Sequence, residues 1–424
     1  MKPRRRLSWM AGLACVLLAA AACGKSGGDT SPSANSTVAP AAAPTLSGDP
    51  VVIGSMYPVN AALASFPDLQ YMAQIAVDVV NAKGGIKGRP FKWVHCDDKG
   101  DPNVAATCVN QLINQDKVQA LVESVGLQGN IAWPAIKKAD ILNWFNVPIW
   151  PDDGTSPLSY PAGLGIYAHQ NVGLLVKQGE FKKVRCLSAT GNVSPKLCGF
   201  AQASLAAKGV TDFKNIFWPP GTTAFQPYAS KVLADGADAV VVAISDAGAA
   251  PVLQALADAG ANVTALAPST SIGSKSIDVA KKNNIPLRVA GSWAVDPARF
   301  KGRQEMLDNV QRYSKAVGAP ATMDTTSDNA FNIYQGIVSL AAVMNGAKSL
   351  KTADLQDYIK THPIATGVAP PLDWTKPGPV PASPRIVQIY GTPEKIDGGK
   401  GLVSDSTTWS SSFPGVSAVS CCTP

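Results

Sequence analysis

The side chains best suited to chemistry in this sequence are aromatic, amide, imidazole and carboxylate groups at the edges of predicted strands. Tryptophan rings can stack on an apolar or aromatic molecule, and Asp246 can accept hydrogen bonds from a cation. Four of these groups have a structural alternative: core packing for the two tryptophans, a satisfied hinge residue for the histidine at position 169, and a helix cap for Asp246. Because these groups bind rather than react, the pattern predicts a small-molecule site. Its members are Tyr57, Trp150, His169, Gln170, Asn192, Asp246 and Trp293.

Catalytic and metal-binding patterns are missing from the sequence. The three histidines are widely separated, and no HExxH, Walker A or GxGxxG motif occurs. Asp97-Asp98 is predicted as a turn and cap rather than a catalytic pair. Gly24 to Gly28 matches the nucleophile elbow of serine hydrolases, yet neither the strand nor the helix of that motif flanks it. We therefore expect no catalytic residue, no metal and no cofactor.

Four of the eight cysteines form two pairs with the same spacing. Cys96 and Cys108 lie twelve residues apart, as do Cys186 and Cys198, and each pair joins a strand end to the start of the next helix. In an exported chain this spacing is compatible with two local disulfides, with buried free thiols as the alternative. Zinc is disfavoured because cysteines with two-residue spacing are absent. Cys421-Cys422 has no assigned role.

The best-defined elements lie in the first quarter of the chain. Apolar residues recur at three- and four-residue steps from Leu69 to Val80, which predicts a helix ended by Gly84-Gly85, because glycine tolerates the positive φ of a helix end. Phe91 to Cys96 is a predicted strand. Asp101-Pro102 begins a second helix, with the aspartate as cap and the proline at the first helical position. This order is typical of an α/β fold.

Strands continue to alternate with helices along the rest of the chain. This alternation predicts parallel sheets with helices on both faces and ligands outside the carboxyl ends of the strands. After Tyr167 the pattern restarts, with a helix expected from Asn171 to Gln178. The predicted strands are Val51–Gly54, Ala120–Val122, Ile141–Phe145, Lys183–Leu187, Phe213–Trp218 and Ala239–Ile244.

Two runs carry a resemblance to a known family. Ala76 to Arg89 resembles the segment A-x-x-x-I-N-A-x-G-G-I-x-G-x of the type I periplasmic binding proteins, and Asp97 to Pro102 is similar to their DD-x-x-D-P run. The branch is that of the branched-chain amino-acid (leucine, isoleucine and valine) binding proteins of ABC importers. The resemblance implies two Rossmann-like α/β lobes with parallel sheets, joined by a three-strand hinge that closes over a ligand.

The resemblance also implies a division of the chain. Residues 51–166 and 295–375 form the expected N-terminal lobe, and residues 167–294 and 385–398 form the C-terminal lobe. Residues 399–424 are expected to be an irregular tail. Residues 24–50, rich in glycine, serine, proline and alanine, read as a flexible tether.

The family suggests ligand contacts as well. Its serine- and threonine-rich loop, which supplies donors for the ligand carboxylate, corresponds to Ser124–Gly129 and predicts contacts at Gly126, Leu127 and Gln128. The key hydroxyl position falls at Gly126, and Asp246 would have to replace the glutamate that binds the ammonium group. We therefore expect a branched-chain or other apolar amino acid, with a small amide or aromatic compound as the alternative.

Residues 1–23 are typical of a bacterial export signal. Lys2 and Arg4 to Arg6 precede an apolar run, and Ala20 to Cys23 resembles a lipobox in which Cys23 is acylated. The formal charge is +7, and removing the four basic residues of the leader leaves +3. The remaining basic residues do not cluster, so no nucleic-acid partner is expected.

These observations predict a solute-binding lipoprotein of an ABC importer. It would act as a monomer, be anchored to the outer face of the cell membrane, and pass a small molecule to a membrane permease without changing it. A ligand sensor with the same fold is the first alternative, which a neighbouring kinase or cyclase gene would favour. An exported hydrolase is the second, which turnover of a bound compound would favour.

Overall fold

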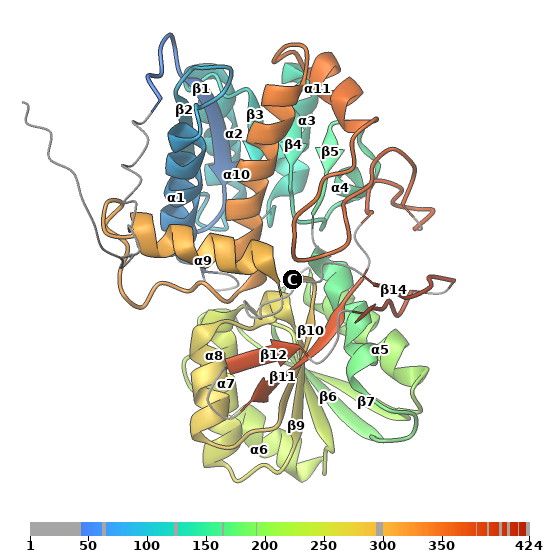
Figure 1. The fold of residues 1–424 in the computed structure, drawn as a ribbon. Coiled ribbons are helices and arrows are strands. Elements are labelled where there is room, and N and C mark those ends of the chain that lie inside the picture. Colours follow the sequence, from blue (N-terminus) through green and yellow to red (C-terminus); the bar gives the residue numbers. More distant parts are fainter. Residues whose placement is uncertain are drawn as a thin grey trace, which may run out of the picture. The chain divides into compact units, whose positions relative to one another are not determined.

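A computed structural model of the protein contains two α/β lobes, each built on its own sheet (Figure 1). The structure describes residues 44–61, 65–122, 126–162, 165–191, 193–293, 300–378, 380–387, 390–397, 401–404, 408–413 and 415–420. The predicted signal peptide, the lipidation site at Cys23, most of the tether and Cys421-Cys422 lie outside these residues.

The first sheet has five parallel strands in the order β2-β1-β3-β4-β5. Its central strands are buried on both faces, which is why β1 and β3 are nearly continuous apolar runs in the sequence. The strands are β1 (Val51–Met56), β2 (Phe91–Cys96), β3 (Ala120–Val122), β4 (Leu142–Trp144) and β5 (Ser159–Tyr160).

Helices from two separate parts of the chain cover this sheet. In Figure 1, α1 and α10 lie side by side although more than two hundred residues separate them in the sequence. As predicted, Pro102 begins α2 and the Asp101 carboxylate accepts hydrogen bonds from the amides of Asn103 (2.7 Å) and Val104 (3.2 Å). The helices are α1 (Leu69–Ala82), α2 (Pro102–Asn110), the π-helical η1 (Gln111–Gln115), α3 (Gly129–Ala139), α4 (Pro151–Thr155), α9 (Lys301–Tyr313), α10 (Asp328–Gly346) and α11 (Thr352–Ile359).

The second sheet has seven strands in the order β12-β11-β10-β9-β8-β6-β7. The strands from β6 to β10 are parallel, whereas β11 and β12 extend the edge in antiparallel pairing. The strands are β6 (Lys183–Ala189), β7 (Asp212–Trp218), β8 (Ala239–Val242), β9 (Thr264–Pro268), β10 (Leu287–Gly291), β11 (Thr392–Asp397) and β12 (Gly401–Ser404).

One helix of the second lobe differs from the prediction. Instead of an α-helix from Asn171 to Gln178, a 3-10 helix, η2, runs from Gly165 to Leu175. The tighter winding brings Gly173 against α5, where an added Cβ would lie 2.9 Å from that of Ser204. The other helices are α5 (Ser194–Ala206), α6 (Gln226–Ala234), α7 (Asp246–Asp258), the 3-10 helix η3 (Ser269–Ser271) and α8 (Ser274–Lys282).

The chain passes between the two sheets three times: after β5, after β10 and after α11. On the third passage Trp374 packs against Trp144 and Tyr160, with ring centroids 5.4 Å apart in both pairs. The expected irregular tail also contains strands, namely β12, β13 (Thr408–Trp409) and β14 (Val419–Ser420), and Trp409 is fully buried in the core of the first lobe. Strands of two to four residues are too short to show a periodicity in the sequence.

Two disulfides tie strands to the helices that follow them. Cys96 at the end of β2 is bonded to Cys108 in α2, and Cys186 in β6 is bonded to Cys198 in α5. Both local pairings suggested by the spacing are therefore present, one in each lobe.

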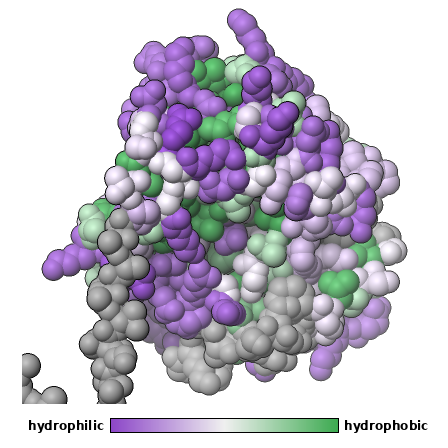
Figure 2. Space-filling model, turned by 45° about the horizontal axis from the view of Figure 1, so that its top comes forward, coloured by the Kyte–Doolittle hydropathy of each residue, from purple (hydrophilic) through white to green (hydrophobic). Residues whose placement is uncertain are grey.

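One face of the molecule is mostly polar (Figure 2). On the face shown in Figure 2, hydrophilic residues predominate and hydrophobic residues reach the surface in separate patches. Leu233, at 40%, is the only strongly exposed large hydrophobic side chain among the residues described. No helix in the described part of the chain is both long and apolar enough to cross a bilayer.

Candidate functional site

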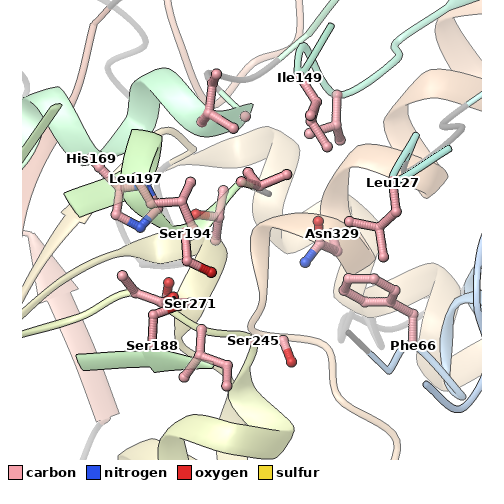
Figure 3. A pocket seen from close by; sticks show the side chains of 17 residues that line it. Phe66, Leu127, Ile149, His169, Ser188, Ser194, Leu197, Ser245, Ser271 and Asn329 are labelled. Carbon is pink, nitrogen blue, oxygen red and sulfur yellow. Dashed lines mark hydrogen bonds between the residues drawn. The ribbon is translucent and has the colours of Figure 1, made fainter. Parts of the chain in front are cut away.

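A cavity of about 120 Å³ is lined by loops from both lobes (Figure 3). Leu127 follows β3 and Ile149 follows β4, whereas Ser245 follows β8 and Ser271 follows β9. In parallel sheets the loops at the carboxyl ends of the strands gather side chains from distant parts of the sequence. The structure therefore places the cavity where this fold class is expected to hold a ligand.

The residues from the first lobe form a mainly apolar surface, which we call the first-lobe wall. Ile149 is nearly buried, and Phe66 reaches the cavity from the loop before α1. Asn329, the second residue of α10, is the polar member, and its side chain makes no hydrogen bond to the residues described. Figure 3 shows its amide group projecting into the cavity. The wall consists of Phe66, Leu127, Val147, Ile149 and Asn329.

The second lobe contributes hydroxyl groups between apolar side chains, and we call this surface the second-lobe wall. The Ser188 hydroxyl donates to the Ala243 carbonyl (2.7 Å) and the Ser194 hydroxyl to the Ala189 carbonyl (2.5 Å), so both retain only acceptor capacity. Other hydroxyls of the wall have no hydrogen-bond partner in the described part of the chain. The wall consists of His169, Ser188, Val193, Ser194, Leu197, Ala243, Ile244, Ser245, Thr270 and Ser271, and Ile166 of η2 also lines the cavity.

His169 is a neutral member of the second-lobe wall. Its side chain is nearly buried, and burial lowers its pKa to about 4, an effect that the Ile166 carbonyl partly opposes. Neither ring nitrogen makes a well-formed hydrogen bond to the residues described. A neutral imidazole has one donor and one acceptor, so His169 can hydrogen-bond a ligand without presenting a charge. The structure thus brings this predicted residue to the cavity.

An adjoining cavity of about 190 Å³ is acidic, and we call it the acidic compartment. The carboxylates of Asp68, Asp246 and Asp324 line it together with the exposed Lys275. It shares Phe66, Ser245, Thr270 and Asn329 with the main cavity. Among the residues described, no three histidine, cysteine or acidic side chains are arranged to hold a metal ion.

Asp246 lies in the acidic compartment, where its carboxylate stabilises a helix start. Its Oδ1 accepts hydrogen bonds from the backbone amides of Gly273 (2.9 Å) and Ser276 (3.0 Å) and from the Ser276 hydroxyl. Burial raises its pKa, and the charge of Asp324 adds to that shift. Asp246 therefore caps α8, a role that differs from the predicted cap of α7, of which it is the first residue.

In the described part of the loop predicted to bind a carboxylate, Leu127 and Gln128 line a third cavity, of about 500 Å³. The Trp150 indole donates to the Gly126 carbonyl (2.7 Å), and the Gln128 amide donates to the Gly100 carbonyl (3.0 Å). Gly129 permits this arrangement, because a Cβ there would lie 2.6 Å from the Trp150 ring. Of these residues, Leu127 alone also lines the main cavity.

Two predicted aromatic contacts are core residues instead. Tyr57 is fully buried and stacks on His95, with ring centroids 4.0 Å apart. Trp293 is also fully buried, between Phe145 (6.3 Å) and Phe331 (5.2 Å). Core packing was the alternative expected for Trp293, and it was not anticipated for Tyr57.

Two further predicted contacts do not contribute to the described cavity. The Gln170 amide donates to the Ser412 carbonyl over 3.5 Å and lines none of the three cavities. Asn192 lies outside the described residues.

Several residues of the cavity were not predicted from the sequence. Ser188 is the last but one residue of β6, and Ser245 and Ser271 follow β8 and β9, so a strict use of the carboxyl-end rule would have found them. Phe66 and Asn329 lie beside helix starts, and no pattern in this sequence links them to a strand end.

Comparison with known proteins finds a matching family model and similar proteins from bacteria. A family model described as periplasmic binding protein matches residues 50–389. An "amino acid binding protein" of Pseudomonas aeruginosa is 24% identical over 351 residues, covering 80% of this chain and 89% of that protein. A "Leu/Ile/Val-binding protein homolog 3" of Brucella melitensis is 25% identical over 201 residues, covering 45% of this chain and 53% of that protein.

Solved structures with the same fold differ in the ligands named with them. A solute-binding protein from R. palustris in complex with 4-hydroxybenzoate has a TM-score of 0.71 at 15% identity, covering 86% of this chain and 97% of that one. A branched-chain amino acid transporter substrate-binding protein from Streptococcus pneumoniae, in complex with isoleucine, has a TM-score of 0.66 at 17% identity, covering 84% and 99%. At these identities the likeness shows the fold alone.

Proposed function

Because this chain belongs to the periplasmic binding protein family, we propose that it captures a small molecule between its two lobes and delivers it to the permease of an ABC importer. The observation that carries the proposal is the cavity lined by loops from both lobes. A ligand that contacts both walls stabilises the state in which the lobes are close, so binding becomes a change of shape that a permease can recognise. Binding of this kind needs no covalent chemistry.

The ligand we propose has an apolar body. The first-lobe wall offers four apolar side chains, and removing apolar surface from water contributes about 25 cal/mol per Å². A branched-chain or other apolar amino acid and a small amide or aromatic compound both have such a body. The proposed contacts are those predicted residues that reach the cavity, Leu127 and His169.

We also propose an extracytoplasmic location with a lipid anchor at Cys23. The support is the sequence alone: a basic start, an apolar run and the lipobox-like Ala20 to Cys23. Two or more acyl chains hold a protein stably on a membrane surface. The protein would work there as a monomer on a flexible tether. Replacing Cys23 with alanine should release the protein from the membrane fraction, and a variant that stays bound would contradict the anchor.

The proposed lobes follow the predicted division of the chain. Residues 51–166 and 295–375 would move as one body, and residues 167–294 and 385–398 as the other. Sheet membership supports this division, because β1 to β5 belong to one sheet and β6 to β11 to the other. Residues 401–404 join the second body as β12.

A thermal-shift screen over amino acids, amides and aromatic acids tests the proposed function. A compound that binds only the folded protein raises its melting temperature, and we call the compound with the largest saturable shift the panel ligand. Ser245→Trp should abolish the shift, because Ser245 is half-buried in the cavity wall and its hydroxyl makes no hydrogen bond to the residues described. Leu233→Trp, which adds the same ring on exposed α6, should leave it unchanged.

The screen can also contradict the proposed function. If no compound shifts the melting temperature, or if Ser245→Trp and Leu233→Trp respond alike, solute binding in this cavity is contradicted. The transport step is tested separately by uptake of the labelled panel ligand in cells that lack the protein. We expect uptake to fall and to return with the wild-type chain but not with Ser245→Trp.

A further inference from the structure

We infer that the cavity selects an uncharged molecule, namely a small aromatic or branched aliphatic body that carries one carboxamide or hydroxyl group read by Asn329. The inference rests on the proposed function, because it assumes that the cavity between the two walls is the ligand site. It names the class of ligand, and it separates this chain from binding proteins whose ligands are carboxylates or free amino acids.

The first reason is that the described residues lining the cavity carry no charge. Among the described residues that line it, none is aspartate, glutamate, lysine or arginine, and His169 is neutral at physiological pH. A buried charge without a partner costs several kcal/mol, so such groups stay in water unless the site supplies an opposite charge. A free amino acid would bring two charges into the cavity, and an organic acid one.

The second reason is the charge beside the cavity. Helix starts usually attract anions, but two of the three helices that begin at the cavity edge start with aspartates, Asp246 in α7 and Asp328 in α10, whereas α5 starts with Ser194. The acidic compartment adds Asp68 and Asp324 on the same side. A ligand carboxylate placed near the start of α7 would therefore meet the carboxylates of Asp246 and Asp324.

Those aspartates are also engaged within the protein. Asp246 accepts bonds at the start of α8, Asp324 accepts from the Ser274 and Thr326 amides, and Asp68 accepts from the Asp324 amide. Asp328 accepts from the Ser269 hydroxyl over 2.5 Å. They hold helix starts and the junction between the lobes in place, so a ligand ammonium group would have to compete with these bonds.

The third reason is the balance of donors and acceptors. The Asn329 amide is about nine-tenths buried, projects into the cavity and has no hydrogen-bond partner among the residues described (Figure 3). Across from it, the hydroxyls of Ser188 and Ser194 offer lone pairs, and those of Ser245 and Ser271 can donate. A carboxamide or a hydroxyl satisfies both kinds of group, whereas a carboxylate can only accept.

The volume of the cavity limits the size of the ligand's apolar part. An engineered cavity of about 150 Å³ lined by apolar side chains binds benzene. The cavity here, about 120 Å³, therefore suits a phenyl ring or a branched chain of four or five carbons.

Three isosteric compounds test the inference on the full-length protein: benzoate, benzamide and benzamidine, whose head groups carry one negative, no and one positive charge at pH 7.5. Calorimetric titration should show benzamide binding at least tenfold more tightly than either charged compound. Isovaleramide should likewise bind more tightly than leucine. If a charged member of either set binds as tightly as its amide, or if neither amide binds, the inference is overturned.

Variants of Asn329 test whether its amide hydrogen-bonds the head group of the ligand. Asn329→Asp should raise the benzamidine-to-benzamide affinity ratio at least tenfold, because it places a carboxylate beside the amidinium group. Asn329→Leu, of similar size, should weaken benzamide binding about tenfold. An unchanged ratio in Asn329→Asp overturns the role of Asn329, and the wild-type titrations stand independently if a variant fails to fold.

The failure of this inference can be told from the failure of the proposed function. If leucine or benzoate binds in place of the amides and Ser245→Trp abolishes that binding, the cavity is a solute site of another ligand class. If no compound of the full screen binds, the solute-binding function itself is contradicted.

Discussion

The two walls of the cavity differ in what they offer a ligand. The first-lobe wall has four apolar side chains and the single amide of Asn329, whereas the second-lobe wall has five hydroxyl groups and the neutral His169 among its apolar side chains. Burial of apolar surface is non-directional, while hydrogen bonds depend strongly on geometry. Both walls therefore contribute apolar contact, and discrimination between head groups depends on Asn329 of the first lobe and on the hydroxyl groups of the second.

A hydrogen bond joins the two lobes next to the cavity. The Ser269 hydroxyl, next to Thr270 in the second-lobe wall, donates to the carboxylate of Asp328, next to Asn329 in the first-lobe wall. A ligand that draws Thr270 and Asn329 together therefore acts one residue away from a contact between the lobes. A change in ligand contact at Thr270 or Asn329 can therefore alter the hydrogen bond that holds the two lobes together.

The largest expected effect comes from a charge on the apolar wall. Leu127→Asp should weaken binding of the panel ligand at least a hundredfold, because the new carboxylate must be buried against an apolar body without a partner. Leu127 is half-buried, so the substitution should leave the melting temperature of the free protein nearly unchanged. Leu127→Met serves as the matched control and should bind normally. Equal binding by Leu127→Asp would show that this wall does not face the ligand.

The link between the walls should depend on pH. Burial raises the pKa of Asp328 to about 7, although the nearby Arg303 opposes the shift. Between about pH 4 and pH 7 the folded protein therefore keeps a proton that the unfolded chain has lost. Stability should fall as pH rises through this window, by up to about 1.4 kcal/mol per pH unit.

The matched variant for this prediction is Asp328→Asn. Urea unfolding at pH 5 and pH 7 should show a larger loss of free energy of unfolding for the wild type than for the variant. Arg303 of α9 and Glu394 of β11 face the same buried region and are present in both proteins, so the two proteins differ only in the Asp328 carboxyl group. Parallel pH profiles would contradict a raised pKa at Asp328.

A truncation of the apolar wall should have a moderate effect. Ile149→Ala removes apolar contact with the ligand and should weaken binding about tenfold, equivalent to about 1.4 kcal/mol. Leu233→Ala removes a similar side chain from the exposed surface of α6 and should not change affinity. Calorimetric titration of the panel ligand checks both variants. A loss of affinity of less than twofold for Ile149→Ala would show that the first-lobe wall contributes little to binding.

The smallest expected effect comes from single hydroxyls of the second-lobe wall. Ser271→Ala should weaken binding roughly threefold, since one neutral hydrogen bond contributes about 0.5–1.5 kcal/mol. Ser188→Ala should matter less, because its proton already goes to the Ala243 carbonyl. A larger loss of affinity for Ser271→Ala than for Ile149→Ala would show that hydrogen bonding contributes more to binding than apolar contact does.

The sequence predicted the fold better than the site. The start of α2 at Asp101-Pro102 and the strand Phe91–Cys96 follow from local rules, because a cap and an apolar run need only their neighbours. The strands of the tail escaped prediction, since β12, β13 and β14 have only two to four residues, too few to show a periodicity.

The site depends on contacts that sequence spacing does not reveal. Trp150 was predicted to stack on a ligand, but the absence of a side chain at Gly129 allows its indole to bond the Gly126 carbonyl. Trp293 packs between Phe145 and Phe331, which lie far from it in the sequence. Leu127 and His169 reached the cavity as predicted, because both lie where the chain leaves or enters a sheet.

Hydrogen–deuterium exchange with and without the panel ligand tests the central claim most directly. If the ligand lies between the walls, it should protect peptides of residues 126–149 in the first lobe and of residues 188–197 and 243–271 in the second lobe at the same ligand concentration. Protection confined to one lobe, or found only outside both walls, would contradict capture of a solute between the lobes.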